Sequence, residues 1–160
     1  MNLPIITRGN VRNSVFICIS LVLLLVAAAM TVSSDEPRPP AILHPVANAN
    51  FKSTNDPVCL ATAVEVGNPS IGPSTVLLKA NRGCVVRWHF HSAQEQLMVI
   101  KGELKIELTS LAATTLSPGG FAFLPSKEKH QFTCTHKSEC LFFLMIDRAY
   151  DSTWVRPDTN

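Results

Sequence analysis

From about Val58 to Val155 the hydrophobic residues come in short runs separated by turn residues, and helical periodicity never lasts beyond a turn or two. Short runs rich in β-branched and aromatic residues, bounded by Gly, Pro, Asn and Ser, are typical of strands. Their regular recurrence predicts an all-β sandwich or barrel, and the lack of an internal repeat predicts a single one. The predicted strands are Cys59–Val66, Thr75–Ala80, Cys84–His91, Glu95–Lys101, Glu103–Leu108, Gly120–Leu124, Gln131–Thr133 and Leu141–Ile146.

The start of the chain has a different pattern. Arg8 and Arg12 precede an apolar run, Ser14–Met30, and small residues at 32–34 follow it. A basic start, an apolar stretch and a small-residue exit are the parts of a secretory signal peptide. We therefore expect residues 1–34 to be a signal peptide and the protein to be exported, periplasmic or secreted. The alternative is an uncleaved anchor that holds the protein at a membrane, facing outside.

Export changes the charge balance of the chain. Without Arg8 and Arg12 the 14 basic residues become 12, against 12 acidic ones. A chain with no basic excess is a poor partner for nucleic acid. The rest of the chain divides into a Pro-rich arm at 35–57 with no regular element expected, the β domain at 58–155 and a tail at 156–160.

Cysteine usage agrees with export, because four cysteines remain once Cys18 leaves with the signal peptide. An even number in an oxidising compartment favours disulfides. Cys134 and Cys140 flank a short polar turn, and they would face each other if the flanking segments form a hairpin. A bridge between Cys59 and Cys84 is the second one that we expect. Four buried thiols are the alternative.

The candidate chemistry is concentrated in two stretches. His89 and His91 lie two residues apart on a predicted strand, so both imidazoles point to one face. Glu95 starts the returning strand after a short turn, and a Pro-led turn delivers His130 to the head of a later strand. Three neutral imidazoles and one carboxylate form a ligand set for one divalent transition metal ion. Such a set leaves one or two coordination positions open to water, substrate or dioxygen.

The first stretch resembles the first cupin motif: Gly, five residues, His-x-His, three residues, Glu, six residues, Gly. Gly83, His89, His91, Glu95 and Gly102 match it at every position. The resemblance implies a single-domain cupin jelly roll of the type-2 kind, similar to small bacterial cupins of unassigned function.

The second stretch resembles the second cupin motif: Gly, five residues, Pro-x-Gly, two residues, His, three residues, Asn. Gly119, Pro125 and His130 match, whereas Lys127 stands at the second Gly and Cys134 at the Asn. These departures concern turn geometry and packing around the site, but not the ligands themselves.

Two remaining basic side chains have less specific patterns. Arg87 shares the strand parity of His89 and His91, so it would either meet an anionic substrate or pair with a surface acid such as Glu107. His44 in the arm, like His136 in the polar turn, is expected to be a solvated surface residue.

The metal itself depends on where it is loaded. Arg8 and Arg12 are not adjacent, so the segment is no twin-arginine signal, and we expect export unfolded with loading outside. Affinity at a nitrogen-rich site then favours copper or zinc. Iron, manganese or nickel would be found only if supply decides.

Two functions fit these features. The first is a metal-dependent, oxygenase-like enzyme that acts on a small organic molecule. The second is a non-catalytic cupin module that binds a small ligand or the metal. The cupin resemblance adds the expectation of a homodimer.

Overall fold

The computed structural model describes residues 39–135 and 137–156. The chain divides into two units, residues 1–42 and 43–160. Of the first unit only residues 39–42 are described, and they are exposed and irregular. The predicted signal peptide or anchor and most of the predicted tail lie outside the described residues, as does His136. No helix among the described residues has the length and apolar character needed to cross a bilayer.

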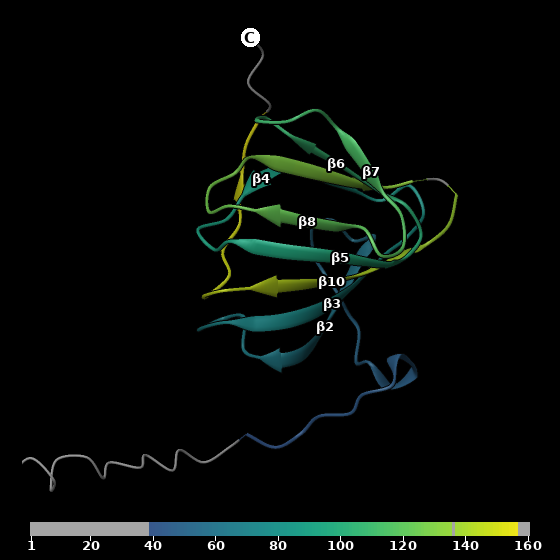
Figure 1. Ribbon diagram of the computed structural model, residues 1–160, viewed down its shortest axis with the longest axis vertical. Coiled ribbons are helices and arrows are strands. Elements are labelled where there is room, and N and C mark those ends of the chain that lie inside the picture. Colours follow the sequence, from purple (N-terminus) through teal and green to yellow (C-terminus); the bar gives the residue numbers. More distant parts are fainter. Residues whose placement is uncertain (1–38, 136, 157–160) are drawn as a thin grey trace, which may run out of the picture. The chain divides into compact units, whose positions relative to one another are not determined.

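The unit from residue 43 onward is a sandwich of two antiparallel sheets, so the all-β prediction is confirmed (Figure 1). The six-stranded sheet has the order β1 (Lys52–Ser53), β2 (Leu60–Gly67), β3 (Ser74–Ala80), β10 (Cys140–Ile146), β5 (Glu95–Lys101), β8 (Phe121–Leu124). The five-stranded sheet has the order β11 (Thr153–Trp154), β4 (Val85–Phe90), β9 (His130–Cys134), β6 (Leu104–Leu108), β7 (Thr114–Leu116). Consecutive strands are thus often in different sheets, as in a jelly roll.

All eight predicted strands form, with ends shifted by a few residues at most. Three short strands, β1, β7 and β11, were not predicted. The expectation of no regular element in 35–57 is wrong, because a 3-10 turn, η1 (Val46–Asn48), and β1 lie there. Lys-Ser is a poor strand sequence on its own, and β1 forms because Lys52 and Ser53 pair with Thr62 and Ala61 of β2.

The core lies between the sheets, and alternation along a strand is clearest on β5. On β5, Leu97 and Val99 are buried, whereas Gln96 and Met98, which directly precede them, are exposed. Each buried aliphatic side chain of this kind contributes roughly 2 kcal/mol of transfer free energy.

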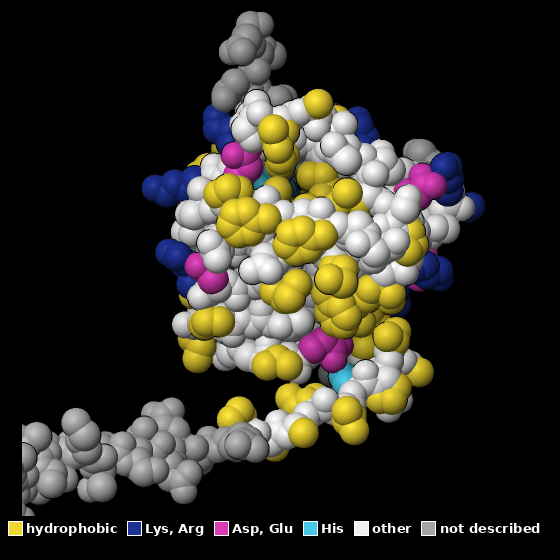
Figure 2. All heavy atoms as spheres, in the orientation of Figure 1, with side chains coloured by type: hydrophobic (Ala, Val, Ile, Leu, Met, Phe, Trp, Pro, Cys, Tyr) yellow, Lys and Arg dark blue, Asp and Glu magenta, His cyan; other side chains and the backbone are white. Residues whose placement is uncertain are grey.

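Two phenylalanines of the five-stranded and six-stranded sheets meet across this core. Phe132 on β9 contacts Phe142 on β10 edge to face, with ring centroids 5.3 Å apart. By contrast, Phe121 and Phe123 on the edge strand β8 are 50% and 49% exposed. Figure 2 shows hydrophobic side chains gathered over the outer face of the sheet that carries β5 and β8.

Two disulfides, Cys59–Cys84 and Cys134–Cys140, close one end of the sandwich, with Cα atoms 5.6 and 5.7 Å apart. Both predicted pairings are therefore confirmed, and the alternative of four free thiols is wrong. The expected hairpin around Cys134 and Cys140 does not form, because β9 and β10 belong to different sheets. Each disulfide instead joins the two sheets, since Cys59 precedes β2 and Cys84 precedes β4.

Candidate metal centre

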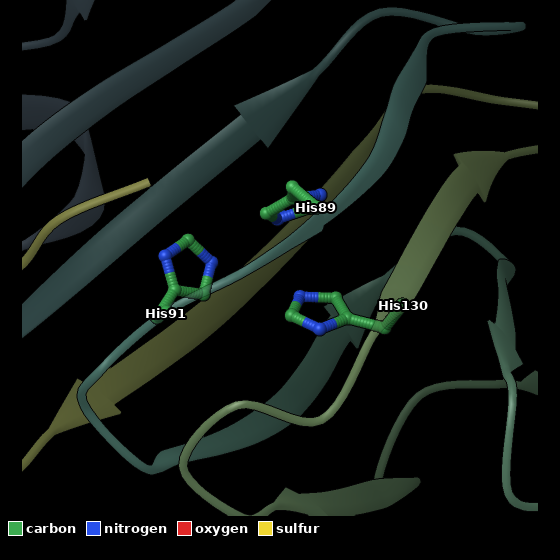
Figure 3. A group of neighbouring side chains, drawn as sticks. All are labelled: His89, His91 and His130. Atoms are coloured by element: carbon green, nitrogen blue, oxygen red, sulfur yellow. The ribbon is translucent and has the colours of Figure 1, made fainter. Parts of the chain in front are cut away.

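The four predicted ligands meet at the end of the sandwich opposite the disulfides. His89 lies near the end of β4, His91 directly follows that strand, Glu95 begins β5 and His130 begins β9. His89 and His130 are register partners on neighbouring strands. All four side chains are buried, at 2–3% relative exposure. Figure 3 shows the three imidazole rings turned toward a common space between these strands.

The distances place the four groups around one centre. One ring nitrogen from each histidine lies within 4.8 Å of the others, so the three could hold a metal ion. Glu95 reaches the same place, with Oε1 3.3 Å from His91 Nε2 and Oε2 3.4 Å from His130 Nε2. Residues from three strands and from both sheets thus converge on a space of the size that one cation needs.

Backbone carbonyls fix the orientation of all three rings. His89 Nδ1 lies 2.5 Å from the carbonyl of Arg87, and His130 Nδ1 lies 2.9 Å from that of Glu128. His91 Nδ1 likewise contacts the carbonyl of Asp151. A carbonyl only accepts, so each Nδ1 carries the proton and each Nε2 presents its lone pair. This is the arrangement that metal-ligating histidines use.

Burial sets the charge of the cluster. Desolvation lowers the pKa of each of the three histidines to about 4, so all are neutral at pH 7. Desolvation raises the pKa of Glu95 to about 7. No Lys or Arg among the described residues pairs with this carboxylate. A buried carboxylate beside three neutral imidazoles lacks a cation, and the donor set therefore fits a divalent metal ion.

One residue of the site was not singled out from the sequence. The ring of Tyr150 stacks on His91 with centroids 4.3 Å apart, and its hydroxyl donates to Glu95 Oε1 at 3.0 Å. The hydroxyl oxygen of Tyr150 also lies 2.9 Å from His91 Nε2. Burial raises the pKa of Tyr150 well above its usual value, so the hydroxyl keeps its proton. The available signal was that Tyr150 is the chain's only tyrosine and follows its last long strand.

The segment after β10 is held across the site by hydrogen bonds at several points. The Asp151 carboxylate accepts from the backbone and hydroxyl of Ser92, at 2.8 and 2.9 Å. Tyr150 N donates to Pro69 O at 2.7 Å, and Val155 N donates to Trp88 O at 3.0 Å. The segment thus carries both the carbonyl that orients His91 and the hydroxyl that contacts Glu95.

The two departures from the second motif have clear consequences. Lys127 adopts the left-handed backbone conformation, with φ 66°, that the motif's Gly would adopt without strain. It still donates its N–H to the carbonyl of His91 at 2.8 Å. Cys134 is bonded to Cys140 at the far end of β9, so the position of the motif's Asn serves the disulfide here.

The predicted strand parity of Arg87 is wrong. The β4–β9 register shifts between Val86 and His89, so these two point inward three residues apart while Arg87 points outward. The guanidinium pairs with Asp56 and lies over the ring of Trp154, 4.8 Å from its centroid. Arg87 therefore pairs with a surface acid, which is Asp56 and not Glu107.

His44 is exposed, as predicted, and it also bonds the arm to the sandwich. Its Nδ1 lies 2.6 Å from Glu65 Oε2, and the Glu65 hydrogen bond raises the pKa of the imidazole.

A cavity of about 220 Å³ opens next to the cluster, between the two sheets. His89, Glu95, His130 and Tyr150 form part of its wall. The candidate metal centre therefore faces a space in which a small molecule would fit.

Comparison with known proteins identifies the class to which this fold and site belong. Residues 76–147 match the cupin domain family. Residues 76–147 therefore form a cupin domain, and the resemblance of the chain's two histidine motifs to the cupin motifs is thereby confirmed. Among proteins with curated descriptions, none matches the sequence.

Solved structures share the fold at low sequence identity. The polyketide cyclase RemF from Streptomyces resistomycificus is 15% identical, with TM-score 0.65 over 76% of this chain and 89% of the cyclase. The DMSP lyase DddQ from Ruegeria pomeroyi is 16% identical, with TM-score 0.60 over 92% of this chain and 98% of the lyase. A cupin-2 domain from Rhodospirillum rubrum is 14% identical, with TM-score 0.60 over 74% and 83%. These likenesses show the fold alone.

Proposed function

We propose that this protein is an exported, metal-dependent cupin enzyme, oxygenase-like, that acts on a small organic molecule. One divalent transition metal ion would be held by His89, His91, Glu95 and His130. The observation that carries the proposal is the buried cluster of three oriented Nε2 lone pairs and one uncompensated carboxylate beside a cavity. A bound metal would supply Lewis acidity and, if redox-active, reactivity toward dioxygen.

The chain's own residues would prepare the site in three ways. Backbone carbonyls hold each imidazole in one tautomer, so the ligands need little reorganisation. Tyr150 places a protonated hydroxyl on the cavity wall, where it donates to Glu95. Most of the wall is apolar, so a molecule bound there would displace water, which strengthens the electrostatic interactions inside.

In this proposal, export determines where the metal is loaded and therefore which metal the site holds. Two disulfides are typical of proteins that fold in an oxidising compartment. A site that is filled in that compartment does not receive its metal in the cytoplasm. The relative affinities of the metals would then decide which one binds, and they favour copper or zinc over iron, manganese or nickel. Two structural relatives bear the names of enzymes, a polyketide cyclase and a DMSP lyase, so this fold houses catalysis elsewhere.

Elemental analysis of protein purified from its native compartment tests the metal. We expect about one equivalent of copper or zinc per chain, as in a mononuclear site. His91→Ala should lose that metal, whereas His44→Ala, which removes an exposed imidazole outside the site, should keep it. Unchanged metal content in His91→Ala would contradict the ligand assignment. A content of iron or manganese alone would contradict the affinity argument.

A non-catalytic binding module is the second candidate, and one observation favours it. The other carboxylate on the cavity wall, Asp56, is paired with Arg87, so no free acid beyond Glu95 is available for proton transfer. Dioxygen uptake and product formation with metal-loaded protein, over small phenols, thiols and organic acids, discriminate the two. Tight binding without turnover would favour the module.

A further inference from the structure

The wall of the cavity is divided by chemistry into one polar cluster and a large hydrocarbon surface. The cluster consists of the metal-site side chains and Tyr150, which contact one another directly. Most of the remaining wall comes from inward-facing core side chains of both sheets, among them Leu97, Ile106, Phe132 and Leu144. A ligand in this space would therefore touch polar groups at one place and hydrocarbon nearly everywhere else.

The few other polar side chains on the wall are largely engaged with the protein. The Thr54 hydroxyl donates to the carbonyl of Pro57 at 2.6 Å, and Ser152 Oγ lies 3.4 Å from His91 Nδ1. The Asp56 carboxylate is paired with Arg87. Thr62 is then the remaining hydroxyl on the wall. A sugar or polyol would bury several hydroxyl groups here and leave most of them without partners, each at a cost of about 1–3 kcal/mol.

Charge excludes another class of ligand. None of the described residues that line the cavity is Lys or Arg. Arg87 is the basic side chain at Asp56 and Trp154, and it points outward with its charge compensated by Asp56. A phosphorylated molecule would lose its hydration without gaining a basic partner, which disfavours its entry.

The volume limits the size of the ligand. An apolar cavity of about 150 Å³ in another protein takes benzene. Benzene has six non-hydrogen atoms, so at the same volume per atom a cavity of about 220 Å³ takes roughly nine.

We propose that the cavity takes an uncharged molecule with an apolar carbon skeleton, aromatic or branched, and one oxygen-bearing group directed at the histidine cluster. This inference rests on the proposed function, because the cluster is taken as the point where the oxygen binds. It excludes sugars, polyols and phosphorylated molecules as ligands.

Calorimetric titration of the full chain with three probes of similar bulk tests this inference. The probes are para-methylbenzyl alcohol, the polyol 1,5-anhydroxylitol and isobutyl phosphate, which have the same number of non-hydrogen atoms, each added to metal-free and to zinc-loaded protein. We expect the alcohol to bind at least about tenfold more tightly than the other two in both forms, and more tightly with zinc than without. Equal or tighter binding of the polyol or the phosphate would overturn the inference.

Two variants locate the binding in the cavity. Leu144→Phe fills part of the wall and should weaken the alcohol at least about tenfold while leaving zinc content unchanged. Ile100→Phe adds the same ring on β5 at a position that is 38% exposed, and should leave binding unchanged. If Leu144→Phe does not fold, Val76→Ile makes a smaller addition to the wall and should weaken binding less. Unaltered binding in a folded wall variant would place the alcohol elsewhere.

These outcomes separate the two proposals. If the protein takes up no metal but metal-free protein still selects the alcohol, the metal function fails and the inference holds. If zinc binds at one equivalent and the probe order is reversed, the metal site holds and the inference fails.

Discussion

The two ends of the sandwich are built on the same strands and are stabilised differently. β4 begins next to Cys84 and ends at the histidine pair, and β9 runs from His130 to Cys134. At the disulfide end, covalent bonds join the two sheets. At the histidine end, four buried ionisable side chains are held by carbonyls and by Tyr150.

The difference concerns what each end needs from outside the chain. The disulfide end is complete once oxidised, and its sulfur atoms carry no charge. The histidine end buries a carboxylate whose pKa is raised to about 7 because no cation accompanies it. A covalently fixed end can therefore support an end that is left ready for a ligand, which is a common division in functional proteins.

Removing the disulfides should have the largest effect and should be confined to one end. The Cys59–Cys84 bridge spans 25 residues, and the Cys59→Ala/Cys84→Ala variant should lose about 3 kcal/mol of unfolding free energy. The Cys134–Cys140 bridge spans 6 residues, and its removal should cost about 2 kcal/mol, because a shorter loop constrains the unfolded chain less. Urea denaturation measures both.

The zinc content of each folded variant is the control for this comparison. It should equal that of the wild type, because the sulfur atoms lie at the opposite ends of β4 and β9 from the histidines. Loss of zinc in either variant would show that the two ends are coupled. An equal destabilisation would contradict the loop-length argument.

The pH dependence of zinc affinity should come from Glu95 alone. In the metal-free protein this carboxyl group holds its proton up to about pH 7, whereas the three histidines stay neutral down to about pH 4. Zinc would bind the carboxylate form, so between about pH 5 and 7 the affinity should rise about tenfold per pH unit and then level off. Competition with a chelator at several pH values measures the slope.

The sign of the Glu95 effect on stability is opposite to its effect on zinc affinity. Its folded pKa lies above the unfolded value of 4.5, so its contribution to metal-free stability is fully present below pH 4.5. That contribution is lost as pH rises through about 7. Glu95→Gln cannot release a proton and should bind zinc weakly, with no slope between pH 5 and 7. A slope of three protons in the wild type would mean that the histidines titrate with the metal.

The sequence predicted most of the strands and the four converging side chains. The eight strands were visible because they are apolar runs bounded by turn residues, and the four candidate ligands were visible because their spacing resembles the cupin motifs. β7 and β11 were missed because each is only two or three residues long and forms by pairing with β6 and β4. Such pairings depend on tertiary contacts that local patterns do not contain.

One wrong prediction and one missed residue have the same origin, because both depend on structure that the local sequence pattern does not contain. The parity of Arg87 was wrong because a register shift in β4 cannot be read from alternation. Tyr150 was missed because it has no fixed spacing from either motif. The position of Tyr150 is set by two hydrogen bonds. Its own N–H donates to the carbonyl of Pro69, and the carboxylate of the next residue, Asp151, accepts from Ser92.

Tyr150→Phe should have the smallest effect of the three, and it sharpens the comparison because it changes only the histidine end. The variant keeps the ring that stacks on His91 and removes the hydroxyl that donates to Glu95. Loss of that hydrogen bond should destabilise the metal-free protein by about 1 kcal/mol, as measured by urea denaturation.

The zinc titration of this variant separates a role in the site from a role in packing. The Tyr150 hydroxyl lowers the pKa of Glu95, so its removal should raise that pKa and move the levelling of zinc affinity to higher pH. A substitution that only loosens packing would leave that pH unchanged. Phe121→Leu, on the exposed face of β8, is the matched control and should leave the zinc profile as it is. An unshifted profile in Tyr150→Phe would mean that the hydroxyl does not act on Glu95, and that the histidine end depends on its carbonyl contacts alone.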